Sequence, residues 1–288
     1  MLPLPKLLLI RGLGHSGTTL LDLALGAHPQ IQGFGEAVRL LRRPAPGEEG
    51  GGPARLRREL RHERLCTCGR TAAQCPVWGP LLEWLPVHDH LPLAEKWQRL
   101  AVQAREQAAA QPPLRWMVDS YQSDLELLTL PDAEIGMEIR AVFLVRDVRS
   151  WVHAIARRPR GQRASGWRSL ARWHRINGQL ERRLQAAGKP VFQLGYEELA
   201  LAPEAALSRL CHWLELSFEP GMLTPGPSSS SHILSGNSMR FDPLKSAHIR
   251  YEAAWLNSPF LPVHLALLLP SWQAMNRRLV YSNHLVDP

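Results

Sequence analysis

The chain has 288 residues, of which 45% are hydrophobic, and it contains ten tryptophans. This composition excludes an intrinsically disordered chain and supplies enough apolar surface for the core of one α/β domain. The formal net charge of +8, from 34 basic and 26 acidic residues, favours an anionic partner: a nucleotide, an acidic substrate, a nucleic acid or a membrane surface.

The N-terminal apolar run is short and leads directly into a glycine-rich turn. We therefore expect it to be the first strand of the fold and not a signal peptide. No apolar run in the sequence is long enough to span a bilayer. These features predict a cytoplasmic protein with no membrane span, in which the four cysteines are reduced thiols.

The first motif is a predicted strand over residues 6–11, a glycine-rich turn and a predicted helix over 17–27. Backbone N–H groups and the helix dipole make such a turn an anion site. Gly12 and Gly17 keep the Walker spacing, but Thr18 replaces the lysine that reaches the β- and γ-phosphates of a triphosphate. A shorter 5′ anion, such as a phosphosulfate, fits this loop better. The alternative is a strand–turn–helix corner without a ligand.

Glu36 follows a glycine-hinged turn, Gly33-Phe34-Gly35, shortly after the first helix. A single carboxylate that returns towards the anion site is a candidate general base. The alternative is a glutamate at a helix N-terminus, where the dipole stabilises it. Residues 44–54 then form a flexible loop rich in Pro and Gly, which is either a lid over an acceptor pocket or a plain surface loop.

Three cysteines, Cys66, Cys68 and Cys75, lie within ten residues. This grouping suggests a metal knuckle, but a closed zinc site needs four ligands. His62 or Cys211 could supply the fourth ligand, although neither has a recognised spacing. We therefore predict a compact turn with buried thiols and no metal.

Strands and helices alternate through the rest of the chain. We expect strands at 114–118, 140–145 and 190–194, and helices at 92–109, at about 148–157, at 164–187, from Pro203 to about 214, and around 261–279, with a loop at 224–231. This alternation favours an α/β fold with a P-loop-type parallel sheet flanked by helices on both faces. We find no repeat and no linker, so residues 1–288 are predicted to form a single domain.

The strand at 140–145 runs directly into Arg146. Ligands of parallel sheets bind at the carboxyl ends of the strands, so Arg146 should lie on the same rim as the glycine-rich turn. A guanidinium there suits bidentate binding of a phosphate. The competing interpretation is a salt bridge with Asp147 or another neighbour.

Arginines are concentrated in two regions, and we expect most of them to form solvated faces. The regions contain Arg39, Arg42, Arg43, Arg55, Arg57, Arg58, Arg61 and Arg64, and then Arg157, Arg158, Arg160, Arg163 and Arg168.

The order and spacing of five motifs resemble the bacterial-type sulfotransferases that use 3′-phosphoadenosine 5′-phosphosulfate (PAPS), over nearly the whole chain. The motifs are Gly14-His15-Ser16-Gly17-Thr18-Thr19-Leu20-Leu21, similar to the 5′-phosphosulfate loop; Val145-Arg146-Asp147-Val148-Arg149-Ser150, similar to the 3′-phosphate turn; Tyr196-Glu197-Glu198-Leu199 with Pro203; Gly236-Asn237-Ser238-Met239-Arg240, within a segment 224–247 that resembles the loop closing over the nucleotide; and Gly35-Glu36, similar to the catalytic glutamate of the tyrosylprotein-type branch.

The chain departs from this family pattern in two places. His15 replaces the usual Lys or Arg, so it would stabilise the sulfuryl group as a cation or donate one hydrogen bond when neutral, which implies a pH dependence below neutrality. Ala154 stands where the family has a serine eight residues after Arg146, and Ser150, one turn earlier, is the candidate substitute. The Asp119-Ser120 turn also lacks a lysine found in some relatives, with Gln122 close by.

The resemblance implies in-line transfer of a sulfuryl group from PAPS to a hydroxyl of a small molecule, a carbohydrate or a peptide, with Glu36 as general base and no metal. It further implies that the donor is bound by Gly14, His15, Ser16, Gly17, Thr18, Thr19, Arg146, Ser150 and Arg240. Two alternatives remain: a P-loop nucleotide kinase or nucleoside triphosphatase, and a non-enzymatic basic nucleic-acid-binding protein. The sparse aromatic residues among the arginines argue against a nucleic-acid partner.

Overall fold

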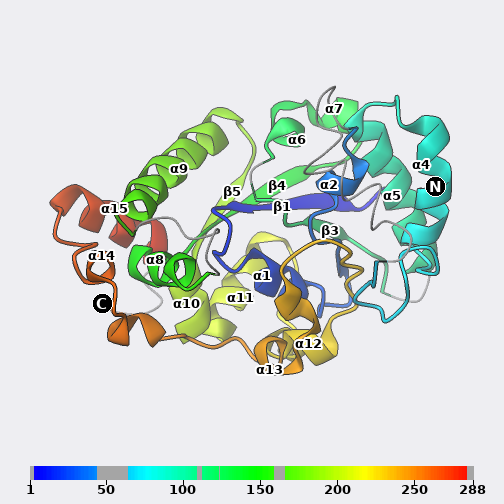
Figure 1. Ribbon diagram of the computed structural model, residues 1–288. Helices are drawn as coiled ribbons and strands as arrows, with labels where there is room; N and C mark the ends of the chain where they lie inside the picture. Colours follow the sequence, from blue (N-terminus) through cyan, green and yellow to red (C-terminus); the bar gives the residue numbers. More distant parts are fainter. Residues whose placement is uncertain (1–2, 44–63, 109–111, 123, 159–165, 284–288) are drawn as a thin grey trace. The chain divides into compact units, whose positions relative to one another are not determined.

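The computed structural model describes residues 3–43, 64–108, 112–122, 124–158 and 166–283. Its strands form one five-stranded sheet in the order β2-β3-β1-β4-β5 (Figure 1). The strands are β1 (Lys6–Gly12), β2 (Ile31–Gly33), β3 (Trp116–Asp119), β4 (Ile139–Val145) and β5 (Val191–Gly195). Pairing is parallel, with Leu8 opposite Val118 and Val142 opposite Phe192. The predicted α/β class, a parallel sheet flanked by helices, is confirmed.

Helices connect these strands. The longer ones are α1 (Thr18–Leu25), α4 (Trp78–His88), α5 (Leu93–Gln107), α8 (Val148–Ala156), α9 (Gly166–Ala186), α10 (Tyr196–Leu201), α11 (Pro203–Trp213) and α15 (Pro270–Val280). Single turns occur at α2 (Val38–Leu41), α6 (Glu126–Thr129), α7 (Asp132–Ile135), α12 (Pro225–Ser228), α13 (Pro243–Ser246) and α14 (Leu261–His264), and short 3₁₀ turns at Pro220–Leu223, Ser238–Phe241 and Ala254–Asn257. Within the described part of the chain, no helix is both long enough and apolar enough to cross a bilayer.

The chain divides into two compact units. The first unit comprises Met1–Ile10, Thr19–Arg140 and Glu219–His248, and the second comprises Arg11–Thr18, Ala141–Phe218 and Ile249–Pro288. In the first unit, α5 packs against α2, α4 and α7. In the second unit, α8, α9 and α14 pack together, and α15 packs against β5 and α10 (Figure 1). The single-domain boundary over residues 1–288 remains a prediction.

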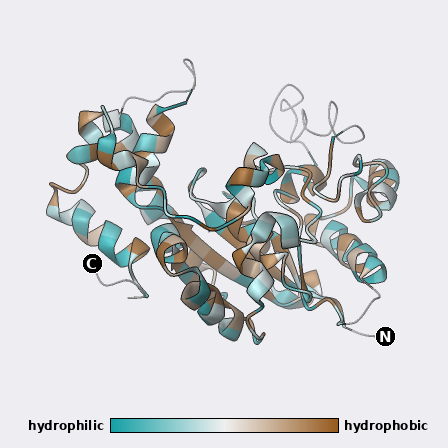
Figure 2. Ribbon diagram, turned by 90° about the horizontal axis from the view of Figure 1, so that it is seen from below, coloured by the Kyte–Doolittle hydropathy of each residue, from teal (hydrophilic) through white to brown (hydrophobic). Residues whose placement is uncertain are grey.

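The core of each unit is built on its strands. Leu7, Leu8, Leu9 and Ile10 of β1 are fully buried, and the strands stand out as a hydrophobic band in Figure 2. Strands that are covered on both faces read as continuous apolar runs, which is why these strands were visible in the sequence. The largest buried side chains include Trp78, Trp97 and Trp116 in the first unit and Trp151 and Trp173 in the second.

Some predicted elements were wrong in detail. The helix expected around 261–279 is two helices, because the chain turns after α14 and Pro270 begins α15 at a position that needs no backbone N–H donor. The loop expected at 224–231 contains the helical turn α12, also opened by a proline. β2 and α4 were not predicted; β2 has three residues, and Pro86 inside α4 argues against a helix. The loop 44–54 lies outside the described residues.

Candidate active site

The predicted strand–loop–helix motif is present, with its loop between β1 and α1. His15 and Gly17 both have positive φ angles, 74° and 97°. Alternation of left-handed residues with ordinary ones turns successive N–H groups towards one side, which is the geometry of an anion-binding nest. Ser16 and Thr18 are buried in this loop. The loop therefore has the backbone shape that a phosphate cradle requires.

Tyr196, the first residue of α10, supports the loop, and both belong to the second unit. A Cβ atom at Gly17 would lie 2.4 Å from Cδ2 of this tyrosine. Glycine is therefore required at position 17 by space as well as by its φ angle. The loop is also fixed at Gly14, whose carbonyl accepts a hydrogen bond of 2.7 Å from Nε1 of Trp151 in α8. Both contacts hold the loop in shape before any ligand binds.

Arg146 lies beside this loop, on the rim where the sequence placed it. Its Nη1 donates to the His15 carbonyl at 3.3 Å, and its guanidinium lies 4.8 Å from the centre of the Tyr196 ring. Nη2 makes a long contact of 3.4 Å with the exposed Glu252. Its Nε is buried and has no hydrogen-bond partner among the described residues. The competing interpretation of a salt bridge is wrong for Asp147, which pairs with Arg149 at 2.8 Å, but Arg146 does form an ion pair with Glu252.

A pocket of about 180 Å³ opens at Arg146 within the second unit. Its lining comprises Arg146, Ser150, His153, Ala154, Arg157, Glu252, Ala254 and Trp255. Ser150 and Ala154 thus line the same pocket, so a hydroxyl is available although the expected serine is missing. An unpartnered guanidinium nitrogen beside a pocket with a hydroxyl suits an anion such as a phosphate.

The turn that carries Arg146 is fixed on both sides. The N–H of Asp147 donates to Glu197 Oε2 at 2.7 Å, and Nε1 of Trp173 donates to the Arg146 carbonyl at 2.9 Å. Burial raises the pKa of Glu197 to about 7, and the negative charge of Asp147 adds to this. Tyr196 and Glu197, adjacent in sequence, therefore support the glycine-rich loop and the arginine turn together. The sequence showed this motif only as a family resemblance.

The surroundings of His15 disfavour a positive charge on its imidazole. Burial lowers the pKa of His15, and the positive charges of Arg158, Arg146 and Arg172 lower it further. Of the two states considered from the sequence, the neutral imidazole that offers one hydrogen bond is the one favoured near pH 7.

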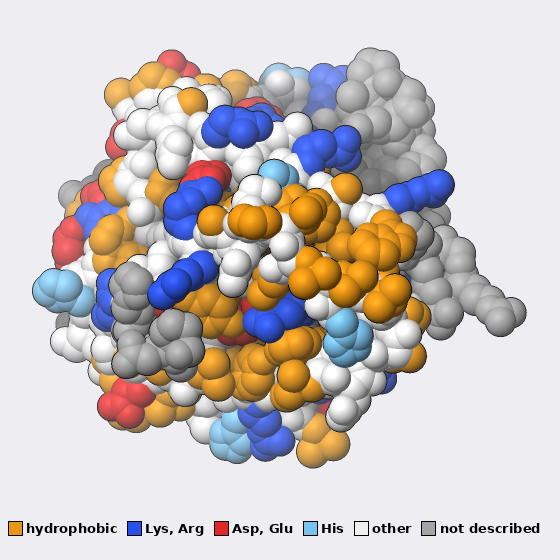
Figure 3. All heavy atoms as spheres, turned by 90° about the vertical axis from the view of Figure 1, so that its left-hand side faces the viewer, with side chains coloured by type: hydrophobic (Ala, Val, Ile, Leu, Met, Phe, Trp, Pro, Cys, Tyr) orange, Lys and Arg blue, Asp and Glu red, His pale blue; other side chains and the backbone are white. Residues whose placement is uncertain are grey.

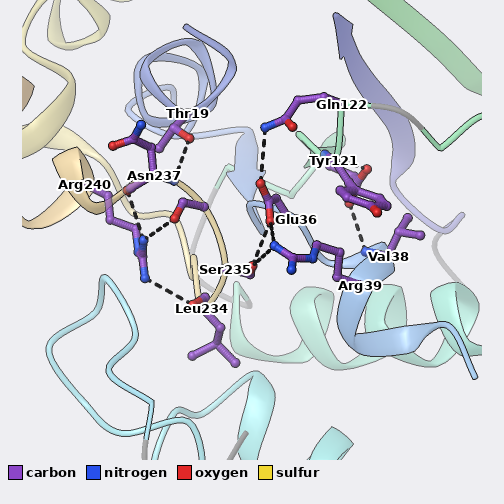
Figure 4. A network of polar contacts seen from close by, with 12 residues as sticks. Thr19, Glu36, Val38, Arg39, Tyr121, Gln122, Leu234, Ser235, Asn237 and Arg240 are labelled. Atoms are coloured by element: carbon purple, nitrogen blue, oxygen red, sulfur yellow. Dashed lines mark hydrogen bonds and ion pairs between the residues drawn. The ribbon is translucent and has the colours of Figure 1, made fainter. Parts of the chain in front are cut away.

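Glu36 lies in the first unit, at the centre of the polar network in Figure 4. Its Oε2 accepts from Arg39 Nη1 at 2.5 Å and from the Ser235 hydroxyl at 2.9 Å, while Oε1 accepts one longer bond of 3.2 Å from Gln122. Its side chain is 10% exposed. The N–H of Val38, the first residue of α2, is instead bonded by the Asp119 carboxylate, so Glu36 does not cap that helix.

Asp22 of α1 holds the glycine turn that presents Glu36, and the sequence analysis missed it. Its Oδ2 accepts from the Gly35 N–H at 3.0 Å and from the Ser120 hydroxyl at 2.8 Å. Burial raises the pKa of Asp22 to about 8. A single acidic residue within the apolar helix TTLLDLAL was the signal that could have identified it.

The segment 224–247, here called the late loop, also belongs to the first unit. The N–H of Asn237 donates to the Thr19 hydroxyl at 3.2 Å. Arg240 donates from Nη1 to the Gly236 carbonyl at 2.7 Å and from Nη2 to the Leu234 carbonyl at 3.2 Å (Figure 4). Burial lowers the pKa of Arg240 to about 10, with a further contribution from another arginine nearby. Arg240 thus organises its own loop, and its expected contact with a phosphate stays a prediction.

The predicted donor-site residues fall into two groups. The second unit holds Gly14, His15, Ser16, Gly17, Thr18, Arg146 and Ser150, and the first unit holds Thr19, Glu36 and Arg240. Each group is connected by the contacts described above.

The basic side chains do not form one continuous field on the face drawn in Figure 3, where they are scattered among hydrophobic ones. Of the two arginine regions, Arg55, Arg57, Arg58, Arg61, Arg160 and Arg163 lie outside the described residues.

Comparisons with known proteins agree with this fold. The chain is similar to the sulfotransferase domain of the curacin biosynthetic pathway, with a TM-score of 0.55 and 17% identity, over 100% of both chains. It also matches the sulfotransferase domain of the Synechococcus PCC 7002 olefin synthase, with a TM-score of 0.43 and 18% identity, over 99% of this chain and 96% of that one. The search of curated proteins gave no match. A model of the sulfotransferase family matches residues 7–220. The match covers most of the chain, which therefore belongs to the sulfotransferase family.

Proposed function

We propose that this enzyme transfers a sulfuryl group from PAPS to an acceptor hydroxyl by in-line displacement. The observation that carries the proposal is the placement of Arg146 at the glycine-rich loop, with a buried, unpartnered Nε beside a pocket. A nucleotide with a 5′ anion and a 3′-phosphate presents two anionic groups, one for the loop and one for the guanidinium. A simple adenylate would leave the arginine without its ligand.

The 5′ end of the donor would be held by the loop in the second unit. Its backbone N–H groups and the hydroxyls of Ser16 and Thr18 supply donors, and His15 adds one from its neutral ring. Thr18 takes the place of the lysine that triphosphate-binding loops use, which supports a donor with less negative charge at this end. These donors would stabilise the charge that develops on the departing phosphate.

The 3′-phosphate would be bound by Arg146, with Ser150 as an additional hydroxyl donor. The fixed turn at Asp147 and the stacked Tyr196 ring hold the guanidinium in place. Such preorganisation lowers the entropy lost on binding and sets the position of the nucleotide along the loop.

Glu36 would act as the general base that accepts the proton of the acceptor hydroxyl. Its Oε2 is engaged by Arg39 and Ser235, whereas Oε1 accepts a single long bond from Gln122. A carboxylate oxygen has two acceptor sites, so Oε1 retains one for an incoming hydroxyl. The proton would move to Oε1 as the hydroxyl oxygen bonds to sulfur and the bond from sulfur to the phosphate oxygen breaks.

Isothermal calorimetry with 3′-phosphoadenosine 5′-phosphate, ADP and ATP–Mg tests the nucleotide class without a known acceptor. We expect the bisphosphorylated nucleotide to bind at least tenfold more tightly than ADP, a difference of about 1.4 kcal/mol. Tighter binding of ATP–Mg would overturn the proposal and favour a phosphate-transferring enzyme.

A further inference from the structure

Four side chains of the types that bind metals converge in the first unit, and none of them is assigned to the transfer reaction. They are the thiols of Cys66, Cys68 and Cys75 and the imidazole of His232, whose ligand atoms all lie within 4.8 Å of one another. The sequence showed the three thiols but not their partner: of the fourth ligands considered there, His62 lies outside the described residues and Cys211 belongs to the second unit. His232 follows Cys75 by 157 residues, so only folding reveals it.

The spacing of these atoms fits tetrahedral zinc. Zinc–sulfur and zinc–nitrogen bonds of about 2.3 and 2.05 Å place sulfur and nitrogen about 3.6 Å apart in a tetrahedron. The observed distances from His232 Nδ1 are 3.1 Å to Cys75 Sγ and 3.9 Å to Cys66 Sγ, on either side of that value. Small movements of the side chains would complete the site.

The local backbone has the form of a metal knuckle. Cys66 N–H donates to the Arg70 carbonyl at 2.8 Å, and the Gly69 N–H donates back to the Cys66 carbonyl at 3.0 Å. This tight turn brings Cys66 and Cys68 to one side. Cys75 lies just before α4, where the N–H of Gly79 bonds its carbonyl at 2.8 Å. The three sulfurs are thus presented by short-range structure alone.

His232 is held against this knuckle by bonds on each side of it. The Thr67 hydroxyl donates to the Ser231 carbonyl at 2.5 Å, and the Ile233 N–H donates to the same hydroxyl at 2.9 Å. Nε1 of Trp78 donates to the carbonyl of His232 at 2.6 Å. These bonds fix the histidine backbone and aim its ring at the thiols.

We propose that Cys66, Cys68, Cys75 and His232 bind one Zn²⁺ ion in a closed structural site. Each thiol releases its proton to solvent and binds as a thiolate, and Nδ1 of the neutral imidazole completes four-coordination. Thiolate and imidazole ligands select zinc over magnesium or calcium. Four protein ligands leave no open position for water, so the site has no catalytic function of its own. This proposal replaces the prediction of a metal-free turn.

The ion would fasten the late loop to the knuckle. The same loop carries Ser235, whose hydroxyl and carbonyl bond the Glu36 carboxylate and N–H. Zinc would therefore stabilise the surroundings of Glu36 without contacting it. The existence of the site does not depend on the role proposed for that glutamate.

The test is elemental analysis of the purified full chain, combined with cobalt substitution. We expect about one zinc per chain, as in structural sites, and intense visible absorption with sulfur-to-metal charge transfer after exchange for Co²⁺. Chelation should lower the unfolding temperature, and added Zn²⁺ should restore it, because an ion that binds only the folded state stabilises it. These readouts are independent of activity.

Cys68→Ala is the sharpest variant because Cys68 is exposed. Truncation of an exposed side chain that binds nothing changes stability little, whereas loss of a direct ligand should weaken zinc binding by more than the roughly 10- to 100-fold caused by loss of an outer contact. Cys211→Ala, which removes the cysteine of the second unit, should keep the zinc. His232→Cys should retain the ion and His232→Ala should lose it.

The proposal is overturned if the wild-type chain holds no zinc and takes up none, or if Cys68→Ala and His232→Ala hold as much as wild type. A disulfide between Cys66 and Cys75 in the purified chain, found by thiol counting and mass spectrometry after handling without oxidants, would also overturn it.

Discussion

Replacement of Arg146 by alanine should weaken binding of the 3′-phosphate specifically. The Arg146 side chain is 11% exposed, its Nη1 already donates to the His15 carbonyl, and its buried Nε has no partner within the part of the chain that the structure describes. A phosphate in the pocket that Arg146 lines would therefore gain at least one hydrogen bond from this guanidinium. One hydrogen bond to a charged group contributes about 1.5–3 kcal/mol, which predicts a roughly 10- to 150-fold weaker affinity of Arg146→Ala for 3′-phosphoadenosine 5′-phosphate.

Adenosine 5′-monophosphate is the matched ligand, since it lacks only the 3′-phosphate. Calorimetry or competition should show that Arg146→Ala binds this ligand within about twofold of wild type, because the glycine-rich loop keeps its own donors and its contacts with Trp151 and Tyr196. Arg146→Lys should lie between the two, because it keeps the charge and loses the fork and the stacking on Tyr196. Arg278→Ala, which removes an exposed arginine of the same unit paired with Glu181, is the control and should not alter either affinity.

The unfolding free energy gives an internal check. Arg146→Ala also removes the Nη1 hydrogen bond to the His15 carbonyl and the stacking on Tyr196, so the free energy of unfolding of the ligand-free protein should fall by about 1–3 kcal/mol. Equal losses of affinity for the two nucleotides would refute the reasoning, because Arg146 would then act through the loop and not through the 3′-phosphate.

Three further predictions concern the remaining site residues. Glu36→Gln should abolish transfer, followed as release of the bisphosphorylated product with an acceptor, and leave nucleotide affinity nearly unchanged; equal activity would remove Glu36 from the mechanism. His15→Lys supplies a permanent charge where the lowered pKa keeps the imidazole neutral, so turnover should rise near pH 7 and lose its dependence on acid pH; an unaltered pH profile would contradict this. Asp22, with a pKa of about 8, binds a proton more tightly when folded, so its contribution to stability is complete below about pH 4 and is lost as pH rises towards 8. In Asp22→Asn the temperature of thermal unfolding should fall less between about pH 4 and pH 8 than in wild type. An equal fall in both proteins would exclude Asp22 as its source.

The sequence predicted four of the five strands and the position of Arg146 for clear physical reasons. Buried parallel strands leave continuous apolar runs, and the rule that ligands lie at the carboxyl ends of parallel strands placed Arg146 beside the glycine-rich loop. The loop itself could be recognised from the spacing of its glycines. At position 17 only glycine tolerates both the positive φ angle and the nearby ring of Tyr196.

The remaining features depend on contacts between distant segments. No local pattern links Tyr196 to Gly17 or His232 to the cysteines, because each pair meets only through tertiary packing. β2 and α4 were hidden for a different reason: β2 is too short to show periodicity, and Pro86 lowers the helix propensity of α4. Asp22 was overlooked because burial of an acidic side chain contradicts its usual preference for solvent.

Tyr196 acts as a spacer between the two anion-binding groups of the second unit. One edge of its ring fills the room beside Gly17, and its face carries the Arg146 guanidinium. In the proposed complex, this one aromatic ring would therefore separate the loop that binds the 5′ end of the nucleotide from the guanidinium that binds the 3′-phosphate. Tyr196→Leu would alter the contacts with Gly17 and with Arg146 at the same time. The affinities for the 5′ and the 3′ ends of the nucleotide should therefore change together.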